Sequence, residues 1–317
     1  MASEAYTIGI IGGRGHVGAE LVGLLAGHPG LELTLLASRS GAGRSARELI
    51  ASAPEGLMLE NISPESLAGR APDVTVLALG NGENTPYAEA AAGRSKVVLD
   101  LSADHRFVDG WTYGLPEVNA SAIREASRIA NPGCYATAMM LALSPLVELL
   151  DGPPVCFGVS GYSGAGATPS PRNDPRNLAD NILPYSLVGH THEKEVGRHL
   201  GRAVRFCPSV ASFFRGIMMT VRARVKARTS VDELEHRLHA FYEKAPLVTV
   251  MAGGVPRVPD VAGTNGAAIG GVAVSPEDPR EVALVCAIDN LRKGAASQAL
   301  QNINLALGLP ELMGVEA

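Results

Sequence analysis

An apolar run at residues 6–11 leads directly into a glycine-rich turn at 12–18, and residues 19–25 then follow with helical spacing. Strand, glycine turn and helix in this order are the start of a dinucleotide-binding sheet, because glycines let the main chain approach a pyrophosphate at the helix N-terminus. The same residues could form an ordinary tight turn, but their position at the start of an alternating strand and helix pattern favours a nucleotide site. The cofactor contacts predicted from this turn are Gly12, Arg14, Gly15, His16 and Val17.

The second apolar run, at residues 31–37, ends in Ser38, Arg39 and Ser40. A site for NAD would place an acidic residue near this strand end to bind the ribose 2′-hydroxyl group. Two hydroxyl groups and a guanidinium suit a 2′-phosphate instead, so the sequence favours NADP(H) as the cofactor. The alternative is an ordinary solvated arginine after a strand.

Further buried strands are predicted at residues 73–79 and 96–101, with a helical stretch around 86–93 between them. This alternation predicts a doubly wound parallel sheet, a Rossmann-type domain. Arg106 follows the second of these strands, at the edge where such sheets bind ligands. It could anchor an anionic group, or it could be a surface charge.

The pattern changes in the second half of the chain. Strands are predicted at 155–159, 216–225 and 281–288, and the alternation at the end of 216–225 is typical of a half-buried antiparallel strand. Ser230 and Glu233 have the spacing of a capping box that begins a helix through about residue 244. A closing helix is predicted from residue 294 to 307, and the whole pattern indicates a second, α+β domain.

Cys134 lies in the sequence Asn-Pro-Gly-Cys-Tyr-Ala-Thr at residues 131–137, directly before a helix-forming run. Pro132 and Gly133 interrupt the backbone, so the cysteine is predicted in the first turn of a helix. Unpaired N–H groups at a helix N-terminus stabilise the thiolate, which is the nucleophilic form. The other three cysteines, at positions 156, 207 and 286, lie in apolar runs typical of inert buried thiols.

His190, His192 and Glu195 lie within six residues of each other. On a helix, His192 and Glu195 share one face, and a carboxylate beside an imidazole orients it for proton transfer. A polar helix start is an equally good interpretation of these residues. A metal site lacks a clear third ligand, so no metal is predicted.

Composition limits the partners of the chain. It carries 27 Lys and Arg against 32 Asp and Glu, a net charge of −5 without a basic block, which argues against nucleic acid and anionic membranes. The start of the chain does not resemble a secretory signal, and no apolar segment reaches membrane-spanning length. Four widely spaced cysteines without a CxxC pair indicate free thiols in a reducing cytoplasm.

These motifs together resemble the N-acetyl-gamma-glutamyl-phosphate reductases of arginine biosynthesis, a family of semialdehyde dehydrogenases. The most specific marker is the nucleophile signature at 131–137, and supporting segments lie at 100–106, 113–117, 160–166 and 289–296. The chain departs from the family pattern at Arg14 and His16 in the nucleotide turn. It also departs at residues 193–194, where the family more usually has a proline before the acid.

The resemblance implies a Rossmann domain at residues 1–133, to which a helix at about 294–317 returns. It also implies a catalytic and dimerisation domain at 134–293, similar to that of glyceraldehyde-3-phosphate dehydrogenase. Cys134 would be the nucleophile, His192 the acid/base and Glu195 its accompanying acid, with Asn290 near the nicotinamide. Substrate contacts are expected from Arg106, Asn131, Ser163, Gly164 and His190.

The activity implied by the resemblance is NADPH-dependent reductive dephosphorylation of N-acetyl-gamma-glutamyl phosphate through a cysteine thioester, in a cytoplasmic homodimer or homotetramer. Two alternatives among enzymes are a reductase of carrier-bound aminoadipyl phosphate and an aspartate-semialdehyde dehydrogenase. An alternative of a different class is a non-catalytic NADP-binding sensor that keeps the fold.

Overall fold

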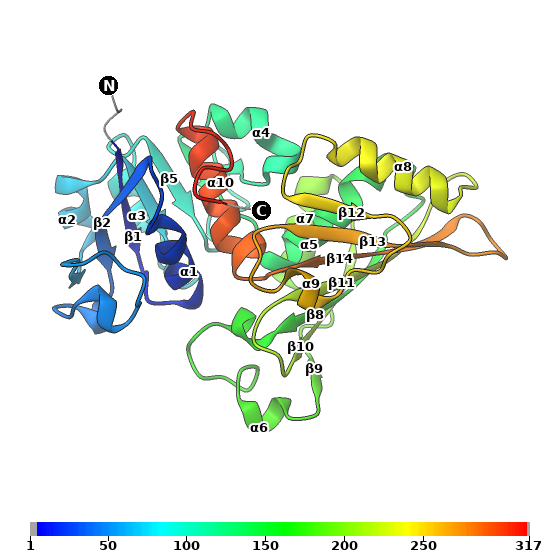
Figure 1. Cartoon of the computed structure of the whole chain (residues 1–317), viewed down its shortest axis with the longest axis horizontal. Coiled ribbons are helices and arrows are strands. Elements are labelled where there is room, and N and C mark those ends of the chain that lie inside the picture. Colours follow the sequence, from blue (N-terminus) through cyan, green and yellow to red (C-terminus); the bar gives the residue numbers. More distant parts are fainter. Residues whose placement is uncertain (1–4, 316–317) are drawn as a thin grey trace. The chain divides into compact units, whose positions relative to one another are not determined.

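The computed structural model describes residues 5–315, which divide into two compact units (Figure 1). One unit combines the chain up to Gly133 with the chain from Ala295 onward, and the other runs from Cys134 to Gly294. The first unit contains a parallel sheet and the second a mixed sheet, so the predicted α/β class is confirmed.

The first unit is built on a seven-stranded parallel sheet with the order β3-β2-β1-β4-β5-β7-β6. Strands β4 and β5 are buried at every residue, as expected where helices cover both faces of a sheet. The strand order changes direction between β1 and β4, which is the point where such sheets bind ligands. The strands are β1 (Tyr6–Ile11), β2 (Leu31–Ala37), β3 (Leu59–Glu60), β4 (Val74–Leu77), β5 (Val97–Asp100), β6 (Thr112–Tyr113) and β7 (Arg128–Ala130).

Helices from both ends of the described chain cover this sheet. Helix α10, which buries Leu300 and Ile303 completely, packs against α1, α4 and β5 (Figure 1). A π-helical turn at Arg292–Ala296 precedes it, so the predicted closing helix is present. The helices are α1 (His16–Leu25), α2 (Pro64–Arg70), α3 (Thr85–Ala91), α4 (Pro116–Arg124) and α10 (Ser297–Ala306), with short 3₁₀ turns at Arg39–Gly41 and Ala46–Glu48.

The second unit is built on a seven-stranded mixed sheet with the order β12-β13-β14-β11-β8-β10-β9. The predicted antiparallel strand is β11, which pairs with β14 on one side and β8 on the other and alternates between buried and half-exposed residues. The strands are β8 (Val155–Gly161), β9 (Ile182–Pro184), β10 (Arg205–Ala211), β11 (Ile217–Arg224), β12 (Val248–Met251), β13 (Ala267–Val274) and β14 (Glu281–Ile288).

Helix α5 (Cys134–Leu143) forms the core of this unit, and every residue after Cys134 in it is buried. It packs on β11 and β14 and against α7 (Thr191–Leu200), while α8 (Val231–Tyr242) packs on β12 and β13. The capping box of Ser230 and Glu233 predicted at the start of α8 is present. The remaining helical segments are short: Ser144–Leu149, Tyr162–Ala165, α6 (Pro175–Leu178) and α9 (Val258–Val261).

On the face of this sheet opposite helix α5, side chains of β8 remain partly exposed. Val155 and Phe157 of β8 are 41% and 44% exposed, although their neighbour Cys156 is completely buried. The register places Phe157 opposite Cys207 of β10 and Thr220 of β11, so these residues form one row across the strands. Among the helices of the described residues, none is long and apolar enough to cross a membrane.

Candidate active site

Cys134 is the first residue of helix α5 and the only residue of that helix that is not buried. Its predicted place at a helix start is therefore confirmed. The thiol lies where the main-chain N–H groups of the first turn favour a negative charge. Burial has the opposite effect on Cys156, where it raises the pKa of the thiol to about 12. Of these two thiols, Cys134 is the one in a position to react.

Tyr135 joins the nucleophile helix to both histidines. Its ring lies 6.4 Å from the ring of His190 and 6.1 Å from that of His192, and the two imidazole rings lie 4.8 Å apart. The Tyr135 hydroxyl donates to the main-chain oxygen of Ser209 at 2.6 Å, which fixes the ring. The fold therefore brings the two histidines to the residue next to Cys134.

His190 caps helix α7. Its Nδ1 accepts a hydrogen bond from the main-chain N–H of His192 at 3.1 Å, so the proton of the neutral ring is on Nε2. Burial and then the positive charge of Arg172 lower the pKa of His190, against the opposing charges of Glu195 and Glu193. His190 is therefore a neutral hydrogen-bond donor at pH 7.

Two residues of the site come from the long loop that precedes α7, and sequence reasoning missed both. The guanidinium of Arg172 lies 4.8 Å from the ring centre of Tyr185, and that ring lies 5.6 Å from His190. Burial and the negative charge of Cys134 raise the pKa of Tyr185 to about 12, so its hydroxyl stays protonated. Arg172 adds a positive charge beside this cluster, and its only sequence signal was an arginine in a proline-rich polar loop.

The two acids of α7 differ in their surroundings. Glu195 is completely buried, three residues after His192 on the same helix. Glu193 accepts a hydrogen bond from the main-chain N–H of Phe206 at 2.9 Å, which ties the start of α7 to β10. Glu193 is one of the residues at which this chain departs from the family pattern. It thus helps to position the helix that carries His192.

Asn290 joins another part of the site. Its side chain donates to Ser163 Oγ at 2.9 Å and accepts from the main-chain N–H of Gly216 at 2.6 Å, and Asn290 and Ser163 are almost completely buried. A Cβ atom at Gly164 would lie 2.9 Å from Ser160 Oγ, so a larger residue there would have to displace that hydroxyl group. At the end of the same segment, a Cβ atom at Gly294 would lie 2.8 Å from Cys134 Cβ. The segment 290–294 thus connects the Ser163 region with the nucleophile.

The glycine turn of the first unit has both tight and open positions. Gly12 has a φ of +91°, and a Cβ atom there would lie 2.7 Å from the main-chain oxygen of Ala78. At Gly15, by contrast, no atom lies within 4 Å of such a Cβ, and no side chain caps helix α1 at this residue. The open approach and uncapped N–H groups fit a pyrophosphate. Of the other predicted contacts, Arg14 is exposed, and His16 and Val17 are half-buried at the start of α1.

The three residues after β2 differ in exposure. Ser38 is buried, whereas Arg39 and Ser40 are exposed. Arg39 Nη1 lies 3.3 Å from Glu83 Oε2 in an ion pair in which both side chains are largely exposed. Exposed pairs of this kind contribute little stability, so the Arg39 guanidinium can leave Glu83 and bind a more highly charged anion.

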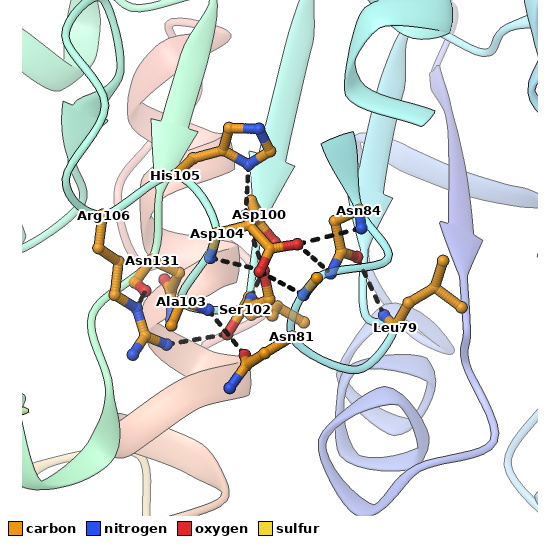
Figure 2. Close-up of polar contacts among 12 residues, drawn as sticks. Leu79, Asn81, Asn84, Asp100, Ser102, Ala103, Asp104, His105, Arg106 and Asn131 are labelled. Atoms are coloured by element: carbon orange, nitrogen blue, oxygen red, sulfur yellow. Dashed lines mark hydrogen bonds and ion pairs between the residues drawn. The ribbon is translucent and has the colours of Figure 1, made fainter. Parts of the chain in front are cut away.

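A polar network occupies the carboxyl ends of β4 and β5 (Figure 2). Arg106, which is 7% exposed, donates from Nε to the main-chain oxygen of Asn131 at 2.9 Å and from Nη2 to that of Leu101 at 3.0 Å. The Asn131 side chain accepts from Asn302 of α10 at 3.0 Å. Asp104 accepts hydrogen bonds from the main-chain N–H groups of Gly82 and Asn84. Arg106 and Asn131, both predicted as substrate contacts, thus hold the main chain at the start of the nucleophile signature.

The second unit brings together most of the residues predicted for chemistry. Its residues Cys134, His190 and His192 surround Tyr135, and Ser163 and Gly164 adjoin Asn290. Within residues 5–315, no group of three or more His, Cys, Asp or Glu side chains could hold a metal ion.

Two family models match the chain. The model described as "Semialdehyde dehydrogenase, NAD binding domain" matches residues 7–126, and "Semialdehyde dehydrogenase, dimerisation domain" matches residues 134–290. A protein of Xanthomonas euvesicatoria named "N-acetyl-gamma-glutamyl-phosphate reductase" is 47% identical over 317 residues, which cover 99% of this chain and 100% of that protein. The "Bifunctional protein argC, mitochondrial" of Dictyostelium discoideum is 43% identical over 99% of this chain and 37% of its own length.

Solved structures share the fold at lower identity. Aspartate semialdehyde dehydrogenase II of Vibrio cholerae superposes with a TM-score of 0.79 at 21% identity, covering 96% of this chain and 99% of that one. The aspartate semialdehyde dehydrogenase of Candida albicans, solved with NADP, gives a TM-score of 0.75 at 15% identity and the same coverage.

Proposed function

This chain belongs to the semialdehyde dehydrogenase family, and on that premise we propose that it reduces N-acetyl-gamma-glutamyl phosphate to N-acetylglutamate semialdehyde with NADPH, in arginine biosynthesis. The full-length similarity to reductases of that name supports this substrate. The observation that carries the proposal is the place of Cys134, which begins a buried helix and whose neighbour Tyr135 touches two histidines.

In this proposal Cys134 Sγ attacks the acyl carbon of the substrate. The new S–C bond replaces the C–O bond to phosphate, and phosphate leaves with the electron pair of that bond. NADPH, when bound, supplies the hydride that reduces the resulting thioester. Main-chain N–H groups at the start of α5 stabilise the oxyanion, an interaction worth about 3 kcal/mol per donor in well-studied enzymes.

The two histidines take different roles. His190 uses Nδ1 to cap α7 and is held neutral, so it suits donation of a hydrogen bond from Nε2 to the substrate. That leaves His192, on the same helix as the buried Glu195, to take the proton of the Cys134 thiol as the sulfur attacks. After hydride transfer the oxyanion collapses to the aldehyde, the C–S bond breaks, and His192 returns the proton to the departing Cys134 sulfur. Ser163, Gly164 and Arg106 are proposed as further substrate contacts, and Asn290 as a contact near the nicotinamide.

The direct test of the substrate is the reverse reaction. The chain should reduce NADP⁺ in the presence of N-acetylglutamate semialdehyde, and only when inorganic phosphate is added. Aspartate semialdehyde and a carrier-bound aminoadipate semialdehyde, tested alongside, distinguish the two alternative dehydrogenases. Failure with every semialdehyde, together with tight NADP binding, would favour the non-catalytic sensor.

We propose that NADP(H) is preferred over NAD(H), because Arg39 and Ser40 are exposed after β2, where an acidic residue would favour NAD. Arg39→Asp is expected to weaken NADP⁺ binding by roughly tenfold or more, because a charge-assisted contact is replaced by repulsion. Glu83→Gln is the matched control: it removes the ion-pair partner of Arg39 and should leave the preference intact or strengthen it. Calorimetric titration with both cofactors measures the effect, and equal affinities in the wild type would contradict this assignment.

We also propose that the chain forms a homodimer, or a homotetramer containing that dimer, through the partly exposed face of the second sheet. The match to a dimerisation domain and the apolar Val155 and Phe157 support this. Phe157→Asp is expected to weaken the dimer by at least about 100-fold, because each of the two subunits loses a side chain worth roughly 2 kcal/mol of burial and gains a charge. Phe241→Asp, at a 42% exposed residue of α8, is the control. Sedimentation velocity at several concentrations would contradict the proposal if the two variants assembled alike.

We propose that the chain works in the cytoplasm. Within residues 5–315 none of the four cysteines forms a disulfide bond, which fits a reducing compartment.

A further inference from the structure

The second unit contains a cavity that shares no residue with the cluster around Cys134. It has a volume of about 510 Å³, within the range of small-molecule sites. Three segments line it: the 3₁₀ segment Ser144–Leu149, the chain after β11 and helix α8. The most buried apolar side chains of its lining are Val225 and Leu234, which are 2% and 3% exposed.

Hydrogen bonds to main-chain oxygens connect the walls of the cavity. The N–H of Lys226 donates to the oxygen of Leu149 at 2.8 Å, and the N–H of Thr229 donates to that of Pro279 at 3.1 Å. Arg237 of α8 donates from Nε to the main-chain oxygen of Pro145, which ties the helix to the first wall. Two walls of the cavity are therefore helical, and hydrogen bonds tie the third wall, the irregular chain after β11, to Leu149 and to Pro279.

Positive charge dominates the lining of the cavity. Lys226, Arg228 and Arg237 line it, and none of them forms an ion pair with a carboxylate in the part of the chain that the structure describes. The single acid, Glu233, already accepts hydrogen bonds from Thr229 Oγ1 and the N–H of Ser230. This positive region is unusual in a chain with a net charge of −5.

The neighbouring arginine emphasises the contrast. Arg224, two residues before Lys226, lies within ion-pair distance of Asp151, Asp278 and Glu281. Carboxylates thus neutralise the arginine at the end of β11 itself, whereas the cations that follow it face the cavity without such partners. Unpaired cations over an apolar floor are complementary to an anion that has an apolar part.

We propose that this cavity is a second ligand site, which binds a small organic anion whose carboxylate or phosphate group is attached to an apolar body. Lys226 and Arg228 bind the anionic group, and Val225 and Leu234 contact the apolar part. The proposal rests on the cavity alone and is independent of the reaction proposed for Cys134.

Two fluorescent probes of similar shape test this site. The anion 8-anilinonaphthalene-1-sulfonate and the uncharged N-phenyl-1-naphthylamine are titrated into the full chain, with excess NADP⁺ present to occupy the nucleotide turn. The double variant Lys226→Gln/Arg228→Gln should weaken binding of the sulfonate roughly tenfold and leave binding of the neutral probe unchanged. Ala240→Trp, which fills the cavity from α8, should weaken binding of both probes.

Lys244→Gln is the matched control, because this exposed lysine follows α8 and lies outside the cavity. Circular dichroism checks that each variant folds. The proposal is overturned if the sulfonate binds the double variant and Ala240→Trp as it binds the wild type. It is equally overturned if the double variant weakens binding of both probes alike, since charge would then play no part.

Discussion

Replacement of Cys134 by serine is expected to abolish reduction of the acyl phosphate, by roughly 10⁴-fold or more in turnover, and to leave NADP binding unchanged. The serine hydroxyl keeps the shape of the side chain but is far harder to ionise, even at the N-terminus of α5. Cys207→Ser is the matched control, because Cys207 is a half-buried free thiol of the same unit outside the cluster of histidines. Steady-state kinetics and cofactor titration measure the two effects.

The covalent step requires an intermediate, which can be observed directly. The acyl phosphate added without NADPH should release up to one phosphate per active site in a burst and leave an acylated protein. Intact-mass spectrometry after rapid acid quenching should show the acyl group on the wild type and on Cys207→Ser, but not on Cys134→Ser. Turnover that survives in Cys134→Ser, without any adduct in the wild type, would refute the thioester mechanism.

Replacement of His192 by alanine is expected to lower turnover by roughly 10²- to 10³-fold and to change KM by much less, because proton transfer contributes to the chemical step. His190→Ala should be milder, since the Nδ1 of His190 is used to cap α7 and its lowered pKa keeps it neutral. His190→Asn is the better comparison, because asparagine can also cap a helix and so removes the imidazole alone.

The pH dependence distinguishes the two histidines. The dependence of turnover on ionisation of the acid/base should disappear in His192→Ala and persist in His190→Asn. Turnover that is unaffected in His192→Ala, but falls sharply in His190→Asn, would move the acid/base role to His190.

Local patterns of the sequence predicted the elements that depend on neighbouring residues. The strand, turn and helix at the start of the chain, the helix beginning at Cys134 and the capping box of Ser230 and Glu233 all follow from residues a few positions apart. Such features arise from backbone conformation and hydrogen bonds within one element, so a sequence pattern can specify them.

Contacts between distant segments could not be predicted in this way. Arg172 lies beside Tyr185 and affects His190 only because the loop that carries it folds back, and Asn131 meets Asn302 across 171 positions of the sequence. Glu193 was considered only as a departure from the family pattern, although it binds the backbone of β10. Nothing in the residues around Arg106 indicated that its guanidinium binds the main-chain oxygens of Leu101 and Asn131.

Helix α10 has a consequence for the order in which the protein is made. The ribosome synthesises the strands of the first unit early, but the helix that packs on α1, α4 and β5 emerges only after the whole second unit. Until then the nascent chain lacks the buried Leu300 and Ile303, and the apolar surface that they cover stays open to water. The unit that is begun first is therefore completed last, and this apolar surface stays exposed for as long as the second unit is being synthesised.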